Sequence, residues 1–255
     1  MYPDVEKLLA EHVEDHHLVL DVGGAGEPSL RADFIVDVMS WETWAAKYRR
    51  RPMADYRFSP ETWYQMDICS GRLPFPDKMF DFSICSHALE DLRDPIAVCK
   101  ELVRVSRGGY IETPSPYIEL TRGVDSGDKR YAGYYHHRWL VSREERGLLF
   151  FAKSHFVHAS RRFHFPPRYA ERFRRQSLDR TRFLWSVSFE ARELIVLDRE
   201  DVERVIEGFI REVSGLNAAI MWHRAKLVGW RAAVATATRL GIRERLRNAL
   251  YGAKE

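Results

Sequence analysis

The stretch "LVLDVGGAGEPSL", Leu18–Leu30, combines a short apolar run, an acid and three glycines within four residues. A short β-branched run closed by glycine is typical of a buried strand. Glycine lets the backbone turn tightly and approach a ligand closely. Asp21 can hold the loop or a cationic group through charge-assisted hydrogen bonds. The stretch therefore predicts a buried strand followed by a ligand-binding loop.

Further apolar segments follow at intervals typical of an α/β chain. Each is short, rich in β-branched or aromatic residues and bounded by turn-forming residues, which predicts strands at residues 34–38, 80–86 and 110–116. Residues 94–109 have an Asp-Pro start, a helical period and a Gly-Gly end, which predicts a helix. Strands that alternate with helices form a parallel sheet, and ligands bind beyond the carboxyl ends of its strands.

The first connection departs from this alternation. Only about ten residues separate Gly26 from Asp37, and these are too few for a crossover helix and a strand. We therefore expect a loop or a shortened helix that begins at Pro28. Upstream, Asp4 can cap a short helix whose apolar residues recur at helical spacing as far as Val13.

The C-terminal half is predicted to contain two long strands and then only helix. Residues 147–160 and 182–197 are apolar, show no helix-length pattern between them, and suit an antiparallel pair at one edge of the sheet. We expect a first domain over residues 1–200, with a lid insertion at about 117–146, and a basic helical extension over residues 201–255.

Composition indicates a soluble globular protein. The chain has 255 residues, of which 45% are hydrophobic and 13% aromatic, enough for the core of one α/β domain with an appendage. No apolar run reaches the roughly 18 residues of a membrane span, and the N-terminus lacks the pattern of a signal peptide, so we expect a cytoplasmic location. Cys69, Cys85 and Cys99 show no CxxC spacing, and the sequence predicts neither a disulfide framework nor a metal site.

The formal net charge of +3 is unevenly distributed. Residues 161–182 hold eight arginines and two acids, and residues 221–255 hold eight basic residues and two acids. Residues 224–252 form a predicted basic amphipathic helix. Such a helix either contacts an anionic membrane surface peripherally or packs on the catalytic domain or on a second subunit of a homo-oligomer. The sequence leaves these alternatives open.

Acidic residues stand near the ends of the predicted strands. Asp37 ends the second strand, and Asp67 precedes the block "LPFPDKMFDFSICSHALEDLRDP", Leu73–Pro95. This series resembles the class I S-adenosylmethionine-dependent methyltransferases, in particular the methyltransferase-11-like group, whose middle reads as an acid, Leu-Pro-Phe, Phe-Asp, a strand and His-x-Leu-Glu. The resemblance covers residues 18–116. It implies an α/β fold with a Rossmann-like, seven-stranded, mostly parallel sheet, its last strand antiparallel, with C-terminal helices and S-adenosylmethionine as the cofactor.

The resemblance also implies roles for individual residues. Glycines after the first strand leave room for the methionine end of the cofactor, an acid at Asp37 suits a bidentate contact with the ribose hydroxyls, and Asp67 can accept from the adenine amino group. The loop departs from the family's Gly-x-Gly-x-Gly, because alanine and glutamate replace its second and third glycines. The implied cofactor-binding residues are Asp21, Gly23, Gly24, Ala25, Gly26, Asp37, Val38, Asp67, Ile68, Ser86 and His87.

A dense aromatic and basic cluster follows the strand predicted at 110–116. "YYHHRW", Tyr134–Trp139, lies in a long connection, and such connections are commonly functional. Aromatic rings suit stacking on a sugar or a planar acceptor, and a histidine can take a hydroxyl proton, so His137 is the predicted catalytic base. The predicted acceptor-binding residues are Tyr134, Tyr135, His136, Arg138 and Trp139. The alternative is a satellite core whose histidines cap backbone groups.

Three polar residues after the third predicted strand have two interpretations each. His87 is a second candidate for the catalytic base, or a strand-end histidine that only satisfies its neighbours. Glu90 and Asp91 can form a carboxylate pair for acid-base chemistry, but we favour a place at the start of the following helix, where acids stabilise the helix dipole.

The predicted function is methylation that uses S-adenosylmethionine, with an oxygen of a glycan or other small molecule as the acceptor. No Asn-Pro-Pro-Tyr or Asp-Pro-Pro-Tyr motif follows the strand at 80–86, which disfavours methylation of nucleic-acid bases, and nucleic acid is not an expected partner. The basic stretches suggest a rival, an RNA-directed enzyme or binding module. The altered glycine loop suggests another, a non-catalytic methyltransferase-like subunit. A dinucleotide oxidoreductase fits the sequence poorly.

Overall fold

The computed structural model describes residues 3–214. The chain divides into two compact units, Met1–Val196 and Leu197–Glu255. Within the second unit the structure describes helix α7 (Arg199–Ser214), in agreement with the helical pattern. The predicted basic helix at 224–252, and with it the expected membrane or subunit contact, lies outside the described residues.

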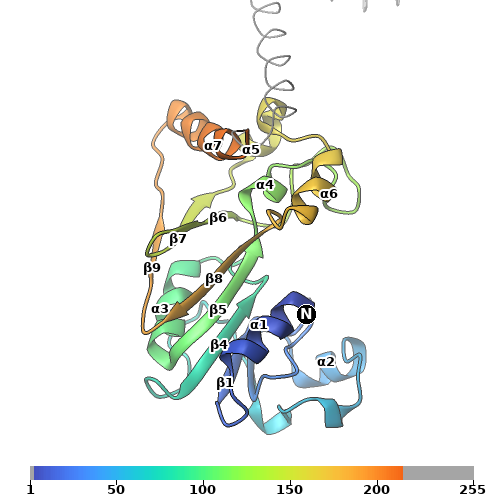
Figure 1. The fold of residues 1–255 in the computed structure, drawn as a ribbon, viewed down its shortest axis with the longest axis vertical. Coiled ribbons are helices and arrows are strands. Elements are labelled where there is room, and N and C mark those ends of the chain that lie inside the picture. Colours follow the sequence, from blue (N-terminus) through green and yellow to red (C-terminus); the bar gives the residue numbers. More distant parts are fainter. Residues whose placement is uncertain (1–2, 215–255) are drawn as a thin grey trace, which may run out of the picture. The chain divides into compact units, whose positions relative to one another are not determined.

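A mostly parallel sheet forms the centre of the first unit (Figure 1). Its order is β3-β2-β1-β4-β5-β8, with β8 antiparallel to β5 and the other neighbours parallel. The Rossmann-like class and the antiparallel last strand are confirmed, but the described residues give this sheet six strands and not seven. The strands are β1 (Val19–Val22), β2 (Phe34–Asp37), β3 (Trp63–Gln65), β4 (Phe80–Ser86), β5 (Ser106–Pro114) and β8 (Arg180–Ser186).

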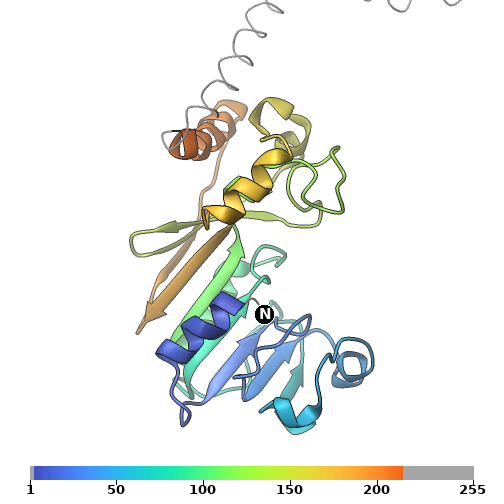
Figure 2. The same cartoon turned by 45° about the vertical axis from the view of Figure 1, so that its right-hand side comes forward.

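Helices α1 (Pro3–His12) and α3 (Pro95–Val105) cover opposite faces of this sheet (Figures 1 and 2). The reason is the alternation of side chains along each strand. Val19 packs in one apolar cluster with α1, whereas Leu20 packs in another with α3. Both neighbours on β1 are apolar because both faces of the strand are buried.

Helix α3 begins as predicted and ends earlier than predicted. The Asp94 side chain caps it by accepting a hydrogen bond of 2.9 Å from the backbone N–H of Ala97. The helix ends at Val105, and β5 begins at the next residue. The two glycines of the expected helix stop therefore lie inside β5. A Cβ at Gly109 would come within 2.6 Å of the Ser83 hydroxyl oxygen, so close strand packing requires glycine there.

The connection between β1 and β2 contains no helix, as the short spacing predicted. Helix α2 (Trp41–Lys47) instead follows β2, and Ser40 caps it. Short 3-10 turns at Met53–Asp55 and Pro60–Thr62 lead on to β3, a strand that the sequence analysis missed. Aromatic residues bind this region to the sheet, because Trp44 packs against Phe58 and Trp63 with ring centroids 5.2 and 5.1 Å away.

The stretches 147–160 and 182–197 do pair, but in parallel and outside the main sheet, so the predicted antiparallel pair at its edge is wrong. Strand β7 (Gly147–Ala152) pairs with β6 (Trp139–Glu144) and β9 (Glu190–Glu193) in a separate three-stranded sheet, while β8 pairs with β5. Helix α6 (Arg168–Arg175) lies between the two apolar stretches, where no helix was expected. Apolar patterning identified strands here, but it carries no information on which strand pairs with which.

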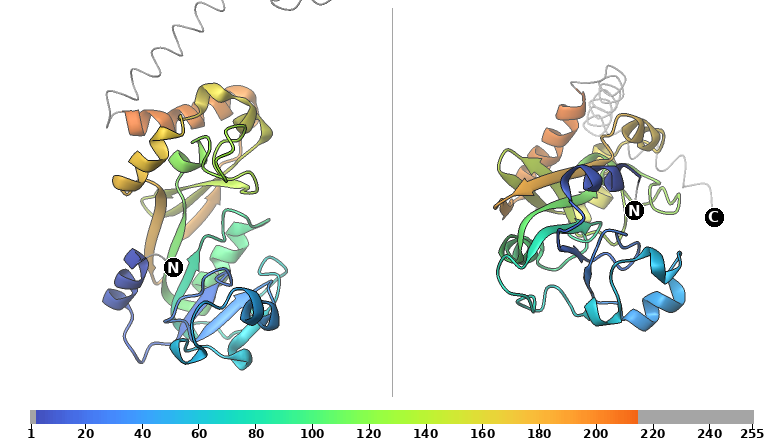
Figure 3. Two further views of the ribbon diagram at one scale, coloured as in Figure 1. Left: turned by 90° about the vertical axis from the view of Figure 1, so that its right-hand side faces the viewer. Right: turned by 60° about the horizontal axis from the view of Figure 1, so that its bottom comes forward.

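Short helices cover the carboxyl end of β5 (Figure 3). They are α4 (Pro116–Glu119), α5 (His155–Ala159), the 3-10 turn Arg161–Phe163 and α6. The backbone joins them, since the N–H of Arg122 donates to the carbonyl of Phe165 at 3.0 Å and the N–H of Phe165 donates to that of Leu120 at 2.8 Å. All three cysteines are free, and none of the helices in the described residues is long and apolar enough to span a membrane.

Candidate active site

Two cavities open at the carboxyl ends of β1, β2 and β4, where the sequence predicted a ligand. They have volumes of about 370 and 300 Å³ and share Gly23 and His87 in their walls. The larger is also lined by Asp37, Val38, Asp67, Ile68, Cys69, Ala88, Asp91, Leu92 and Arg93. The smaller is also lined by Asp21, Gly24, Gly26, Glu27 and Ser86. Together these walls contain all but one of the predicted cofactor-binding residues.

The glycine loop lies directly on the floor of these cavities. Gly23 has a φ of +76° and donates its N–H to the Val36 carbonyl at 2.8 Å, and a Cβ there would lie 2.5 Å from the Ala88 Cβ. A Cβ at Gly24 would lie 2.5 Å from the Asp21 carboxylate. Both positions therefore require glycine, the first for conformation and space and the second for space. Their bare backbone borders the smaller cavity.

Asp21 is a buried carboxylate with one unsatisfied oxygen. Oδ2 accepts a hydrogen bond of 2.9 Å from the backbone N–H of Ser29. Oδ1 is buried and has no partner among the residues that the structure describes. Burial raises the pKa of this carboxyl to about 7. Since Asp21 lines the smaller cavity, its free oxygen suits the ammonium group of a methionine moiety.

Asp37 links the glycine loop to the larger cavity. Its Oδ1 accepts from the N–H of Met39 at 2.8 Å and its Oδ2 from the N–H of Ala25 at 3.1 Å. Each carboxylate oxygen has a second lone pair, which can accept from a ribose hydroxyl. Ala25 is the predicted residue absent from the cavity walls given above, because its methyl packs in the core with Trp44.

The remaining walls of the larger cavity suit a planar base. Val38 is 71% exposed at its rim, whereas Ile68 is buried. Asp67 accepts from the N–H of Cys69 at 2.8 Å, and its Oδ2 lies 3.6 Å from the Arg93 guanidinium. Apolar contacts beside a carboxylate acceptor are what an adenine ring with its amino group requires.

His87 lies between two carboxylates and is a poor candidate for a base. It has a φ of +53° at the end of β4, next to Ser86. Its ring nitrogens lie 3.4 Å from Glu90 and 3.3 Å from Glu112. Burial lowers the pKa of His87, but the two carboxylates outweigh burial and raise it to about 9. The imidazole is thus protonated at neutral pH, where it donates hydrogen bonds and cannot accept a proton.

Backbone hydrogen bonds bring the predicted acceptor segment to the cleft. The N–H groups of Arg138 and Trp139 donate to the Glu90 carbonyl at 2.7 and 3.2 Å, and the indole N–H of Trp139 donates to the Leu92 carbonyl at 2.8 Å. Leu92 and its neighbour Asp91 line the larger cavity. Tyr134–Trp139 therefore borders the cofactor cleft, although it follows β4 by almost fifty residues in the sequence.

His137 is the ordered centre of this segment. Its Nδ1 lies 2.7 Å from Oε1 of Glu119, and the Tyr134 ring stacks on it with centroids 4.5 Å apart. Glu119 is completely buried and also pairs with Lys153. Burial raises the pKa of Glu119, but the contacts with His137 and Lys153 outweigh it and lower the pKa. An ionised carboxylate only accepts, so Nδ1 carries a proton that it donates to Glu119, and Nε2 is the ring nitrogen left for another partner.

Nε2 of His137 is directed to the cleft, since it lies 4.0 Å from Oδ1 of Asp91. Trp139 packs against the core, but three other residues of the segment are exposed. Tyr135 is 66% exposed, and His136 and Arg138 are also exposed. These rings and charges are free to contact an acceptor.

Two residues of this site were not found from the sequence. Glu119 and Lys153 come from separate elements, and no local pattern connects either of them to His137. Glu90 and Asp91 are also not at the start of a helix, which corrects the sequence interpretation, because α3 begins at Pro95. Glu90 is buried beside His87, and Asp91 lines the larger cavity.

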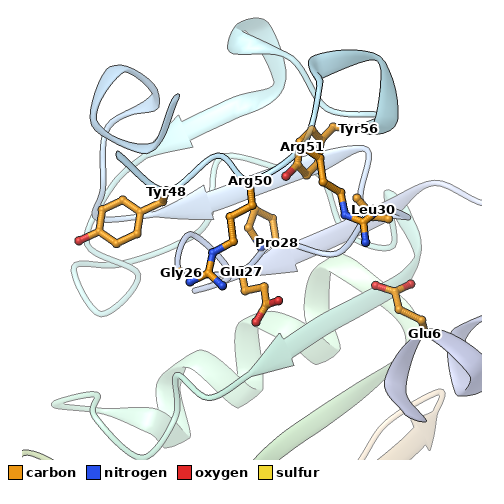
Figure 4. A pocket seen from close by; sticks show the side chains of 9 residues that line it. All are labelled: Glu6, Gly26, Glu27, Pro28, Leu30, Tyr48, Arg50, Arg51 and Tyr56. Carbon is orange, nitrogen blue, oxygen red and sulfur yellow. The ribbon is translucent and has the colours of Figure 1, made fainter. Parts of the chain in front are cut away.

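A further cavity of about 400 Å³ lies on the other border of the glycine loop (Figure 4). Figure 4 shows Glu6 reaching into it from α1, and Arg50 directed toward Gly26 and Glu27. Gly26 and Glu27 also line the smaller cavity of the cleft. Residues 134–139 line none of the three cavities, but their backbone hydrogen bonds to Glu90 connect them to the larger cavity of the cleft and not to this one.

Several known proteins that are similar to this chain are methyltransferases. Residues 31–111 match the family model described as a methyltransferase domain. A similar solved structure is a SAM dependent methyltransferase from Aquifex aeolicus, at 20% identity over 44% of this chain and 65% of that chain, with a TM-score of 0.32. Another, from Mesorhizobium loti, has 16% identity over 56% of this chain and 62% of that chain, with a TM-score of 0.32.

The YcgJ protein from Bacillus subtilis is similar at 20% identity, over 44% of this chain and 50% of that chain, with a TM-score of 0.31. The chain thus spans less than two thirds of the length of these three solved structures. No curated protein matches the sequence. Residues 31–111 thus match a methyltransferase domain, and the strand order and the acids at the cleft agree with a class I methyltransferase that uses S-adenosylmethionine as its cofactor.

Proposed function

We propose that the protein transfers the methyl group of S-adenosylmethionine to a hydroxyl oxygen of a small-molecule or glycan acceptor. One observation carries the choice of oxygen. Nδ1 of His137 is bound to Glu119, so Nε2 is the nitrogen available to an acceptor, and it faces Asp91, which lines the cofactor cleft. A hydroxyl becomes a better nucleophile as its proton leaves, so an oxygen acceptor needs a proton acceptor in this place.

The residues of the cleft have different roles according to where they lie. The cofactor supplies a methyl group on a positively charged sulfur when it is bound. Asp21, Asp37 and Asp67 hold its two ends by accepting hydrogen bonds, and the bare backbone of the glycine loop lets it lie close to the strand ends. The protein thereby contributes orientation and exclusion of water more than chemistry of its own.

The acceptor surface suits a hydroxylated ring. Tyr135 is exposed and lies with its ring centroid 6.2 Å from that of Tyr131, which is also exposed. The exposed Arg138 follows His137 directly. Aromatic faces with a neighbouring cation are typical of sites that stack on sugars and bind their hydroxyls or acidic groups.

A methyl-transfer screen tests the proposal. The purified protein is incubated with S-adenosylmethionine and a panel of sugars and hydroxylated small molecules, and formation of S-adenosylhomocysteine is measured by mass spectrometry. With an accepted substrate, His137→Ala should lower turnover by about 10² to 10⁴ and leave cofactor affinity unchanged by calorimetry. His16→Ala, an exposed histidine near α1, is the control. Full turnover in His137→Ala would contradict the assignment.

A further inference from the structure

A cluster of three ligand-type side chains lies beside the cofactor cleft. Asp91, His136 and His137 each present one ligand atom, and these atoms all lie within 4.8 Å of one another. Oδ2 of Asp91 is 4.0 Å from Nε2 of His136, and Oδ1 is 4.0 Å from Nε2 of His137. One aspartate thus has a separate oxygen near each of two imidazole nitrogens.

These separations do not correspond to hydrogen bonds. A hydrogen bond between such atoms spans about 2.7 to 3.2 Å. Oδ1 of Asp91 is buried and has no hydrogen-bond partner among the described residues, which is costly for a carboxylate oxygen. Two metal–ligand bonds of about 2.0 to 2.1 Å place their ligand atoms about 3 to 4 Å apart, depending on geometry. A separation of 4.0 Å on both sides is too long for direct contact and somewhat wider than the roughly 3.3 Å between two ligand atoms of a tetrahedral ion, so the side chains need to approach one another by less than about 1 Å to bind one.

The buried partners of His137 favour metal binding as well. Metal-ligating histidines commonly donate their second ring N–H to a carboxylate, which fixes the tautomer and makes the ligating nitrogen more basic. Glu119 provides this contact at 2.7 Å, and Lys153 neutralises Glu119 from its other oxygen. The imidazole ring is further held by the stacked ring of Tyr134. The nitrogen turned toward Asp91 is therefore Nε2, the one that a metal ion can bind while Nδ1 donates to Glu119.

A second histidine cluster lacks such support. Glu14, His16 and His17 also bring three ligand atoms together, but Glu14 and His16 are exposed on the surface. In that cluster His17 Nδ1 accepts a hydrogen bond of 3.1 Å from the backbone N–H of Glu14. The cluster near α1 consequently serves as a matched control for the one at the cleft.

We propose that Asp91, His136 and His137 bind a divalent transition-metal ion, such as Zn²⁺ or Mn²⁺, which holds the acceptor hydroxyl. Two imidazoles and a carboxylate are a donor set for these ions, and three protein ligands leave coordination positions open for a substrate oxygen. Asp91 belongs to the wall of the cofactor cavity. An ion held by Asp91 would therefore bind an acceptor oxygen next to the cofactor.

The inference rests on the proposed methyl transfer and changes the role of His137 in it. With the ion bound, Nε2 of His137 is a ligand and no longer takes the proton. The acceptor O–H bond breaks on the metal, which lowers the pKa of a bound hydroxyl, and the proton leaves to water. The oxygen then forms a bond to the methyl carbon while the carbon–sulfur bond breaks, and its electron pair stays on sulfur. The products are the methyl ether, S-adenosylhomocysteine and one proton.

Metal binding is measured without cofactor or acceptor, so that its outcome is independent of the methyl-transfer reaction. The full chain is stripped with a chelator and titrated with Zn²⁺ by calorimetry and with Co²⁺ by visible absorption. We expect one site, with affinity lowered at least about 100-fold in Asp91→Asn and in His136→Ala, since each removes one of three ligands. The double variant His16→Ala, His17→Ala should keep this site.

Two results would overturn the proposal. One is the absence of a bound ion in the stripped wild type at millimolar Zn²⁺ and Co²⁺ while circular dichroism shows that the chain is folded. The other is a site that survives in Asp91→Asn and His136→Ala but disappears in the double variant near α1. If methyl transfer continues in the presence of a chelator, the reaction needs no metal ion and His137 remains the proton acceptor. Failure of this inference is therefore distinct from failure of the proposed function.

Discussion

Asp21→Asn should stabilise the cofactor-free protein in a pH-dependent way. Burial raises the pKa of the Asp21 carboxyl from 3.8 to about 7 in the folded chain, so the folded state holds this proton more tightly than the unfolded state. The stability that comes from this proton is complete below about pH 4 and is lost as the pH rises through about 7. Asparagine keeps the hydrogen bond from Ser29 and never ionises, so the variant does not lose this stability.

The size of the effect follows from the shift. Each pKa unit corresponds to about 1.4 kcal/mol, so ionisation of Asp21 costs the folded protein about 4 kcal/mol in total. About 3 kcal/mol of this falls between pH 5 and pH 8. With a urea dependence of about 3 kcal/mol per molar, the variant should gain about 1 M in urea midpoint over the wild type across that range.

The measurement is urea unfolding of both proteins at pH 5 and pH 8, followed by circular dichroism. All other titrating groups are common to the two proteins, so they cancel in the difference. The exposed Asp55→Asn is the control and should show no pH-dependent difference. A difference between Asp21→Asn and wild type that is the same at both pH values would refute the argument.

Cofactor binding provides an independent measure of the same carboxyl. If the ammonium group of the cofactor binds ionised Asp21, binding at pH 7 must release about half a proton, because the pKa is about 7. Calorimetry in two buffers of different ionisation enthalpy detects this proton, and Asp21→Asn should abolish it together with most of the affinity.

Gly133→Ala should destabilise the fold by about 2 to 4 kcal/mol in urea unfolding, because Gly133 has a φ of +60° and a Cβ there would lie 2.6 Å from the Glu119 Cα. Gly127→Ala, with a φ of +75° and nothing within 4 Å, should lose only about 1 to 2 kcal/mol; equal losses would contradict the steric argument. Glu119→Gln should cost about 3 to 5 kcal/mol in thermal or urea unfolding, since it leaves Lys153 buried and unpaired, and adding Lys153→Met should restore much of this, whereas additive losses would count against the pairing. The imidazole of His87 should titrate by NMR near pH 9, and its stabilising charge should be complete below about pH 6.5 and lost as the pH rises through about 9; titration near 6.5 would show that Glu90 and Glu112 do not hold it.

The cofactor half of this site was available from local sequence. A short β-branched strand, an acid and glycines occur within Leu18–Gly26, and parallel strands bring their carboxyl ends to one edge whatever the details of packing. The acids Asp21 and Asp37 therefore had to lie near one another, whereas the role of Asp67, which follows the missed strand β3, came from the resemblance alone. The short connection to Asp37 likewise excluded a helix by length alone.

The pairing of the later strands was not available in this way. Residues 147–160 are apolar, yet only six of them form β7, and they join β6 and β9 and not β8. An apolar strand pattern indicates that a face of the strand is buried. Which strand it pairs with depends on long-range packing. Helix α6 was not predicted because it has few apolar residues among its arginines. Its Phe173 is buried through contacts with the rings of Tyr117, Phe165 and Tyr169, which come from other parts of the chain or from the helix itself.

The sequence by itself determined the class of fold and the edge of the sheet at which the two cavities of the cleft open, because both depend on periodicity, spacing and residue type. The tertiary structure alone decided which groups can react. His87 loses the role of base because Glu90 and Glu112 approach it from two elements. His137 gains its tautomer from Glu119, and its partner Asp91 from the turn after β4. Charge and hydrogen bonding act through space over a few ångströms, and that distance is unrelated to separation along the chain.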